Sequence, residues 1–208
     1  MVWHFGDSLA QHQLRRVRIR PPASHGLCAS ALGIGFVGIG SSLGWGELLL
    51  ALSKNTTWRE KCKGLIFVGA SLPIPLRTVQ KPKGPPREFW DGLLDKLRED
   101  SLGTLVGTLP FIFGEKVGNK LTEGETRRYE RMAETADPIA VERTVQAFLE
   151  RDLTDVMRHL GEEVTFPILI LHGDSDEDNP IDEGPELVKR LLPTTEIRIY
   201  ENGSHGRC

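Results

Sequence analysis

An apolar run bounded by glycines constrains the fold of this chain more than any other feature of its sequence. The run GLIFVGA, at residues 64–70, contains no polar residue, which is typical of a strand that a parallel sheet buries on both faces. The other strand candidates are GFVGIG (35–40), FPILILHG (166–173) and TEIRIYE (195–201). Helical patterns separate them, among them LGWGELLLALSK and GPELVKRLL. Strands that alternate with helices predict an α/β fold with a mostly parallel sheet.

The segment between the second and third strand candidates differs in character and predicts an inserted helical cap. It opens with the proline-rich loop SLPIPLRTVQKPKGPP, and three or four helical patterns follow it. In the last pattern Asp137 is the expected N-cap, and Pro138 occupies the first turn. We therefore expect a core formed by residues 35–70 and 161–208, a helical cap at 71–160, and a poorly patterned N-terminal segment at 1–34.

Composition places the chain among ordinary globular proteins. Its 208 residues suffice for one domain with a genuine core, and 39% hydrophobic with 26% charged residues is a usual balance. The formal net charge of −3 gives no reason to expect nucleic acid or an anionic membrane as a partner. Cys28, Cys62 and Cys208 cannot all pair and match no metal-site spacing, which favours a reducing compartment, so we expect a cytoplasmic protein. The sequence does not indicate the oligomeric state.

Two other destinations stay open because of the N-terminal arginines. Arg15, Arg16, Arg18 and Arg20 precede an uncharged stretch, residues 21–46, which superficially resembles a signal anchor. Seven glycines make this stretch a poor membrane-spanning helix, so a membrane is the less favoured expectation. An arginine-rich organelle presequence is the other alternative.

The pentapeptide GSSLG, at residues 40–44, matches the pattern G-x-S-x-G at a predicted strand-to-helix corner. This context indicates a nucleophilic serine on a strained turn, with its hydroxyl clear of the sheet. We expect Ser42 to be that serine, with Ser41 as a less favoured rival, and the Leu43 N–H to serve as an oxyanion donor. Glycine is expected to be required at Gly40 and Gly44, since a side chain there would collide with the neighbouring strand or helix. The alternative is that the serines mark a turn and nothing more.

Two later loops carry the groups that a nucleophilic serine requires, a base and an orienting acid. The loop LHGDSDEDNP follows a strand candidate and carries four carboxylates, Asp174, Asp176, Glu177 and Asp178. The loop YENGSHG follows the last strand candidate and carries His205. Both lie where a parallel sheet presents its carboxyl-end loops, the usual place for a site. The alternatives are a solvated acidic loop and a turn histidine.

From the first strand candidate onward the chain resembles the α/β-hydrolase superfamily, and most of all its branch of cofactor-free (non-heme) haloperoxidases and arylesterases. The resemblance is carried by FVGIGSSLGWGE, GLIFVGASLPIPL, FWDGLL, RDLTDVMRHL, FPILILHGDSDEDNPID and EIRIYENGSHG. It implies that Ser42 is the nucleophile, Asp176 the triad acid and His205 the general base. It also implies a structural position for Asp174 and a strand-end position without a catalytic role for His172.

The resemblance implies a serine esterase that acts on a small ester-like substrate by two-step acyl transfer, without a metal or an organic cofactor. Perhydrolysis or haloperoxidation would be a side activity of the same triad. Aromatic residues of the predicted cap suggest that the acyl or aryl group is small and hydrophobic, with core packing as the alternative role for these side chains. They are Phe89, Trp90, Phe111, Phe113 and Phe148.

The resemblance is incomplete at both ends of the chain. Members of this superfamily have several strands and a second oxyanion donor, in an H-G-x-x type segment, before the nucleophile. Here the oxyanion segment has no counterpart, and HFGDS only faintly echoes a G-x-G-x-S turn that precedes a helix in the family. Three residues follow His205 where a closing helix is expected. We therefore expect an incomplete α/β-hydrolase fold that is truncated at both ends. The alternative function is that of a catalytically inactive homologue that binds a ligand or a partner protein through its exposed sheet edge.

Overall fold

The computed structural model describes residues 35–70, 73, 75–79 and 81–207. The predicted N-terminal segment, Cys28 and Cys208 lie outside the described residues, as does most of the uncharged stretch considered as a membrane anchor. None of the helices in the described part has both the length and the apolar character that crossing a membrane needs.

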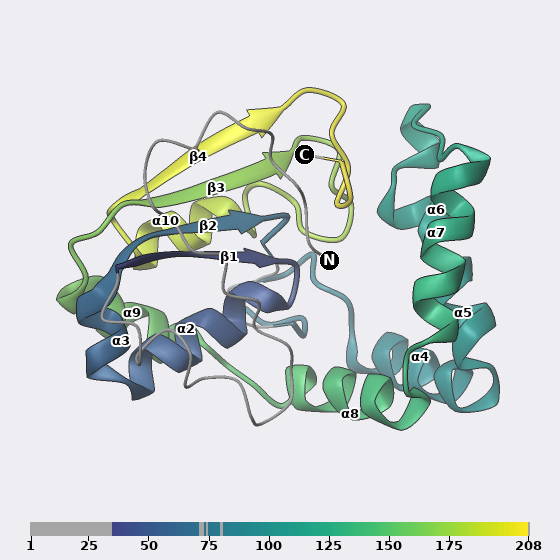
Figure 1. The fold of residues 1–208 in the computed structure, drawn as a ribbon, viewed down its shortest axis with the longest axis horizontal. Coiled ribbons are helices and arrows are strands. Elements are labelled where there is room, and N and C mark those ends of the chain that lie inside the picture. Colours follow the sequence, from purple (N-terminus) through teal and green to yellow (C-terminus); the bar gives the residue numbers. More distant parts are fainter. Residues whose placement is uncertain (1–34, 71–72, 74, 80, 208) are drawn as a thin grey trace.

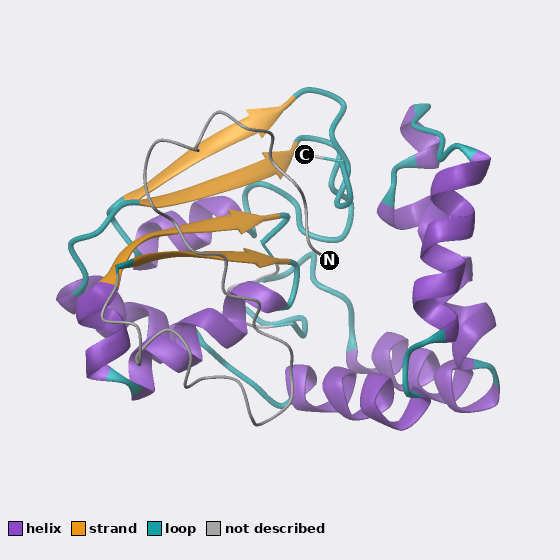
Figure 2. Ribbon diagram, in the orientation of Figure 1, coloured by secondary structure: helices purple, strands orange, loops and turns teal. Residues whose placement is uncertain are grey.

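Four parallel strands form one sheet in the order β1-β2-β3-β4 (Figures 1 and 2). The strands are β1 (Phe36–Ser41), β2 (Cys62–Val68), β3 (Ile168–Gly173) and β4 (Thr195–Tyr200). The predicted parallel α/β sheet is therefore confirmed. Because all four strands run the same way, the loops that follow them meet along one edge of the sheet.

The helices that connect successive strands pack on one face of the sheet, as right-handed crossovers between strands added in sequence require (Figure 1). They include α2 (Gly44–Lys54), α3 (Thr56–Lys61), α9 (Thr154–Glu163) and α10 (Pro185–Leu191). The core lies between this layer and the sheet. Trp45, Leu49 and Met157 from the helices belong to one buried cluster with Phe67 and Ile170 from the strands, and each is at most 1% exposed.

The opposite face of the sheet is open to a large extent among the described residues, which corrects the prediction for β2. Phe67 points into the core, but Ile66 and Val68, which alternate with it, are only half-buried. On β1, Val37 is 42% exposed and Ile39 is 60% exposed. The prediction of burial on both faces was wrong because the described connecting helices all cover the same face.

Between β2 and β3 the chain forms a group of helices beyond the carboxyl ends of the strands, which we call the cap (Figure 1). Its elements are α4 (Arg87–Glu99), α5 (Ser101–Gly107), α6 (Leu109–Ile112), the short 3-10 helix η2 (Glu115–Val117), α7 (Glu123–Glu134) and α8 (Pro138–Leu149). The predicted start of α8 is confirmed. The Asp137 carboxylate accepts hydrogen bonds from the N–H groups of Ile139 and Ala140, and Pro138 lies in the first turn.

Helix α9 follows the cap in the chain but packs with the core. Leu153, Met157 and Leu160 are buried in the same cluster as the leucines of α2. The Leu153 N–H also donates to the carbonyl of Pro73, 2.9 Å away, which fixes the start of this segment. Helix α9 therefore contributes to the core cluster, and the boundary of the cap at residue 160 stays a prediction.

Candidate active site

Strand β1 ends at Ser41, and Ser42 turns the chain directly into α2. Ser42 has a φ of 50°, a left-handed conformation that is uncommon for a non-glycine residue and marks local strain. Its N–H donates to the carbonyl of Val68, 3.0 Å away, and so fixes the corner to the neighbouring strand. Leu43 follows as the N-cap of α2, where a backbone N–H has no acceptor within the helix.

Glycine is required on one side of Ser42 but not on the other. A Cβ at Gly40 would lie 2.6 Å from the backbone N and Cα of Trp45, so α2 could not pack this close to β1. A Cβ at Gly44 would meet no described atom within 4 Å. The prediction that Gly44 avoids a collision was therefore wrong, because this position faces open space at the start of α2.

Ser42, His205 and Asp176 meet at the carboxyl edge of the sheet, from the loops after β1, β4 and β3. Nε2 of His205 lies 2.9 Å from Oγ of Ser42, and Nδ1 lies 3.0 Å from Oδ2 of Asp176. Because a carboxylate only accepts, Nδ1 carries a proton and Nε2 accepts the Ser42 hydroxyl. This arrangement can take the proton from the hydroxyl and keep the resulting imidazolium next to a carboxylate.

Burial and the carboxylates act on the His205 imidazole in opposite directions. Burial lowers the pKa of His205, whereas the hydrogen bond to Asp176 and the charges of Asp176 and Asp178 raise it. The carboxylates prevail, so the pKa of His205 lies above its usual value. The ring is therefore a stronger base than a solvent-exposed histidine.

The Asp176 carboxylate is completely buried and is held by its own loop. Oδ1 accepts hydrogen bonds from the N–H groups of Asp178 and Asn179, at 3.0 and 2.9 Å, which leaves Oδ2 for His205. Nε2 of His172 donates to the carbonyl of Asn179, 2.7 Å away. Burial lowers the pKa of His172 more than the charge of Asp176 raises it, so this ring stays neutral. His172 thus supports the loop that presents Asp176.

The other carboxylates of this loop take different positions. Asp174 is exposed and accepts a hydrogen bond from the Ser175 hydroxyl. Glu177 is exposed and pairs with Lys116 of η2. Asp178 lines a cavity beside Ser42. Across the described ranges, no group of three or more histidine, cysteine, aspartate or glutamate side chains is arranged to hold a metal ion.

The loop that carries His205 passes close to the glycine after β2 and is bonded to the cap. Gly69 has a φ of 53°, and a Cβ there would lie 2.9 Å from the His205 carbonyl oxygen. From the cap, the carbonyl of Ile112 accepts the N–H of Gly206 at 2.8 Å, and Phe113 packs against the same glycine. The sequence analysis did not identify Gly69, although a glycine directly after an apolar strand was the available signal.

A small cavity of about 140 Å³ opens beside Ser42. Its wall is formed by Ser42, Leu43, Pro75, Lys81, Pro85, Trp90, Val145, Phe148, Asp178 and Asn179. Trp90 and Phe148, two of the predicted aromatic residues, stand in this wall with their ring centroids 6.0 Å apart. Lys81 was missed by the sequence analysis, because a lysine in a proline-rich loop gives no sign that it will be buried.

The other three aromatic residues are not part of the wall of this cavity, although the ring of Phe89 packs against that of Trp90 with the centroids 5.4 Å apart. Phe89 and Phe111 are 55% and 46% exposed, because each lies on the outer surface of its cap helix. Phe113 is buried, and its ring packs against Tyr129 with the centroids 4.9 Å apart. Phe113 thus takes the alternative role of core packing, within the cap.

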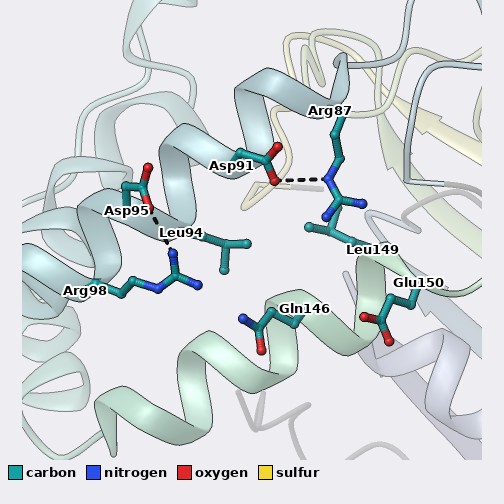
Figure 3. A pocket seen from close by; sticks show the side chains of 8 residues that line it. All are labelled: Arg87, Asp91, Leu94, Asp95, Arg98, Gln146, Leu149 and Glu150. Atoms are coloured by element: carbon teal, nitrogen blue, oxygen red, sulfur yellow. Dashed lines mark hydrogen bonds and ion pairs between the residues drawn. The ribbon is translucent and has the colours of Figure 1, made fainter.

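A larger cavity, of about 350 Å³, lies between α4 and α8 and does not include Ser42 (Figure 3). Its wall is mostly charged, and its arginines are already paired. Arg87 lies 3.0 Å from Asp91, and Arg98 lies 2.9 Å from Asp95. The smaller cavity is therefore the candidate active site, since it contains the serine that contacts His205.

Comparisons with known proteins found relatives along most of this chain, although no family model matches it. It is 27% identical over 174 residues to a non-heme haloperoxidase from Rhodococcus erythropolis, and the aligned residues make up 83% of this chain and 61% of the relative. It is 24% identical over 174 residues to a bifunctional esterase/perhydrolase from Acinetobacter calcoaceticus, and the aligned residues again make up 83% of this chain and 61% of the relative. Among solved structures, the chain is similar to a bromoperoxidase from Bacillus anthracis, with a TM-score of 0.73 and 22% sequence identity. The superposition covers 85% of this chain and 63% of the bromoperoxidase chain. The chain spans about three fifths of the length of the curated relatives it matches.

Proposed function

Because this chain is a homologue of the α/β-hydrolases in the non-heme haloperoxidase and esterase branch, with part of their fold, we propose that it is a serine hydrolase acting on small ester substrates. One observation carries the proposal. Oγ of Ser42 lies 2.9 Å from Nε2 of His205, whose Nδ1 lies 3.0 Å from Asp176. A chain of two hydrogen bonds thus links the hydroxyl, the imidazole and the carboxylate, as acyl transfer by a serine nucleophile, a base and an orienting acid requires.

In the first step, Nε2 of His205 takes the hydroxyl proton while Oγ of Ser42 attacks the ester carbonyl carbon. The oxyanion accepts a hydrogen bond from the N–H of Leu43 at the start of α2, whose dipole favours negative charge there. The imidazolium then donates its proton to the leaving alcohol oxygen as the carbon–oxygen bond breaks. An acyl group remains on Ser42, and Asp176 offsets the charge of the ring throughout.

In the second step, water attacks the acyl group, His205 takes a proton from the water, and the acid leaves as Ser42 is restored. Hydrogen peroxide in place of water would release a peracid by the same route. The Acinetobacter relative is named for both esterase and perhydrolase activity, which supports perhydrolysis as a side activity of this chain.

The cavity wall favours a small hydrophobic group on the substrate. Trp90, Phe148, Val145 and two prolines supply apolar surface around Ser42. A cavity of about 140 Å³ suits a short acyl chain better than a long one.

The experiment is covalent labelling with a fluorophosphonate probe. We expect the wild type to be labelled and Ser42→Ala to remain unlabelled while it stays folded. Ser41→Ala is the matched control, because it removes the neighbouring hydroxyl without touching His205, and it should label like the wild type. Hydrolysis of a short aryl ester should fall by about 10³-fold or more in Ser42→Ala. Labelling of Ser42→Ala, or none of a folded wild type, would refute the proposal.

A second candidate function is a catalytically inactive homologue that binds a partner protein. The exposure of Val37 and Ile39 favours it, because they lie on β1, an edge strand among the described elements. The same labelling experiment separates the two functions, since the inactive homologue would leave the probe unreacted.

A further inference from the structure

Lys81 is a buried lysine in the wall of the candidate active site. It is 4% exposed, and it lines the cavity together with Ser42 and Leu43. Lysine is almost never buried to this extent unless its ammonium is paired with an anion. An anionic group is therefore expected to pair with the Lys81 ammonium.

The loop around Lys81 holds its side chain in place. The N–H of Lys81 donates to the carbonyl of Thr78, and the N–H of Gly84 donates to the carbonyl of Lys81, each at 3.2 Å. The stem of Lys81 lies across Gly84, where an added Cβ would come within 2.8 Å of Cδ. The N–H of Lys83 donates to the carboxylate of Glu183 at 2.7 Å, which ties this loop to the chain that follows Asp176.

Within the described part of the chain, no ion pair joins the Lys81 ammonium to a carboxylate. Burial lowers the pKa of Lys81 below its usual value, although the charges of Asp178, Glu183 and Asp176 act against it. Asp176 is already bonded to His205 and to two N–H groups of its loop, and Glu183 accepts the N–H of Lys83. Asp178 is the carboxylate that shares the cavity wall with Lys81.

A counter-ion for Lys81 can come from the substrate. The Lys81 side chain is buried at the wall of the cavity, and an anion bound in the cavity would pair with its ammonium there. An ester attacked by Ser42 has to occupy the same cavity. We infer that Lys81 is an anion-binding subsite that takes a free carboxylate of the substrate, so that the preferred esters are half-esters of short dicarboxylic acids. This inference rests on the proposed function, since it names the substrate class of that site.

A carboxylate matches the subsite better than a phosphate does. One negative charge neutralises the Lys81 ammonium, whereas a dianionic phosphate would leave an excess charge facing Asp178. The carbon chain between the two ends of the substrate would lie against the apolar surfaces of Trp90 and Phe148. The small volume of the cavity limits that chain to a few carbons.

The test compares monomethyl succinate, which carries a free carboxylate, with methyl pentanoate, a neutral ester of similar length. We expect the ratio of kcat/KM for the anionic ester to kcat/KM for the neutral one to fall about 10- to 100-fold in Lys81→Met, as for a lost hydrogen bond to a charged group. Asp178→Asn should raise the same ratio, because it removes the competing carboxylate. Lys83→Met removes a charge from the same loop outside the cavity and should leave the ratio unchanged.

An unchanged ratio in Lys81→Met, or an equal loss for both esters, would overturn the inference, since Lys81 would then act elsewhere than on the substrate carboxylate. A fall of the ratio in Asp178→Asn would also overturn it. Should Lys81→Met fail to fold, Asp178→Asn tests the same subsite with the opposite sign.

Binding of monomethyl succinate separates failure of this inference from failure of the proposed function. If the wild type hydrolyses neither ester, calorimetry with this monoanion still tests the subsite. We expect the wild type to bind it at least about tenfold more tightly than Lys81→Met does. No binding of monomethyl succinate by the wild type, or equal binding by both proteins, would overturn the subsite.

Discussion

His205 can accept the Ser42 proton only while its ring is neutral, so its pKa sets the lower end of the active pH range. Asp176 and Asp178 raise the pKa of His205 by more than burial lowers it. We therefore expect kcat/KM to fall, as the pH decreases, through a pKa above the usual value of about 6.5. A pH profile of ester hydrolysis measures this directly, and an inflection at or below the usual value would contradict the assignment.

Replacing the acid should move that inflection and slow the reaction. Asp176→Asn removes the charge that raises the pKa of His205 and lets the ring adopt the wrong tautomer. We expect turnover to fall about 10³- to 10⁴-fold and the inflection to move to lower pH. Asp174→Asn is the matched control, because Asp174 is exposed and bonds only its neighbour Ser175 among the described side chains. Equal effects of the two substitutions would show that the buried contact between Asp176 and His205 does not account for the loss of turnover.

The two glycines around Ser42 give a second matched pair at the residue scale. Gly40→Ala places a Cβ against the backbone of Trp45, so we expect it to lower the free energy of unfolding by about 1–3 kcal/mol. Gly44→Ala meets no described atom and lies in the first turn of α2, where alanine should stabilise by up to about 1 kcal/mol. Urea unfolding of both variants measures the difference. Equal destabilisation would contradict the close approach of α2 to β1.

The sequence predicts those site residues that stand directly after strands. Ser42, Asp176 and His205 each follow an apolar run, and parallel strands bring such positions to one edge. Gly69 also follows an apolar strand, but a glycine there carries no chemistry that marks it as part of a site, and Lys81 follows no strand. Lys81 is buried only because its loop folds across Gly84 and is tied to Glu183, which are contacts distant in sequence that no local pattern records.

At the scale of elements, the cap positions the loop that carries His205. Phe113 is 3% exposed, packs against Gly206 and follows Ile112, whose carbonyl accepts the Gly206 N–H. Two further bonds join the same parts, from Asn119 to the carbonyl of Asn202 and from Arg207 to the carbonyl of Lys120. The end of the cap around α6 and η2 is therefore a fixed support for this loop.

Removing the Phe113 ring should loosen that support. We expect Phe113→Ala to lower the free energy of unfolding by about 3–5 kcal/mol. It should also speed hydrogen exchange at the Gly206 amide and lower turnover. Phe111→Ala is the matched control, since Phe111 lies two residues earlier, on α6, and is 46% exposed. Amide exchange followed by NMR or mass spectrometry checks the result. Unchanged exchange at Gly206 in Phe113→Ala would show that the loop is held without the cap.

Elements with strong apolar periodicity are predictable from this sequence, and short polar ones are not. All four strands and α2, α8 and α10 have clear patterns or caps, and the structure confirms them. Helix α3 was not predicted, because its six residues, TTWREK, include one large apolar side chain and bury none. It begins where the Asn55 side chain accepts the N–H of Trp58, an N-cap that the structure reveals.

For the whole molecule, the sheet order determines which surface is open. Strands added one after another, each with a right-handed crossover, place α2, α9 and α10 on the same side. The other face then presents the apolar residues that alternate along each strand with those facing the core, such as Ile39 and Ile66. The positions of β2 that alternate were readable in the sequence, but an all-apolar strand cannot reveal that the described helices cover only one of its faces.

This open face should make the protein associate with itself. Ile39 is 60% exposed on β1, an edge strand among the described elements, where apolar side chains and unpaired backbone groups favour contact between copies. We expect the apparent mass of the wild type in light scattering to increase with concentration, and Ile39→Lys to reduce that increase. Val79→Lys is the matched control, because Val79 is 93% exposed but lies in a loop outside the sheet. If both lysine variants reduce association equally, added charge alone explains the effect; if only Ile39→Lys does, the contact forms through the sheet, since the lysine then interrupts one particular surface.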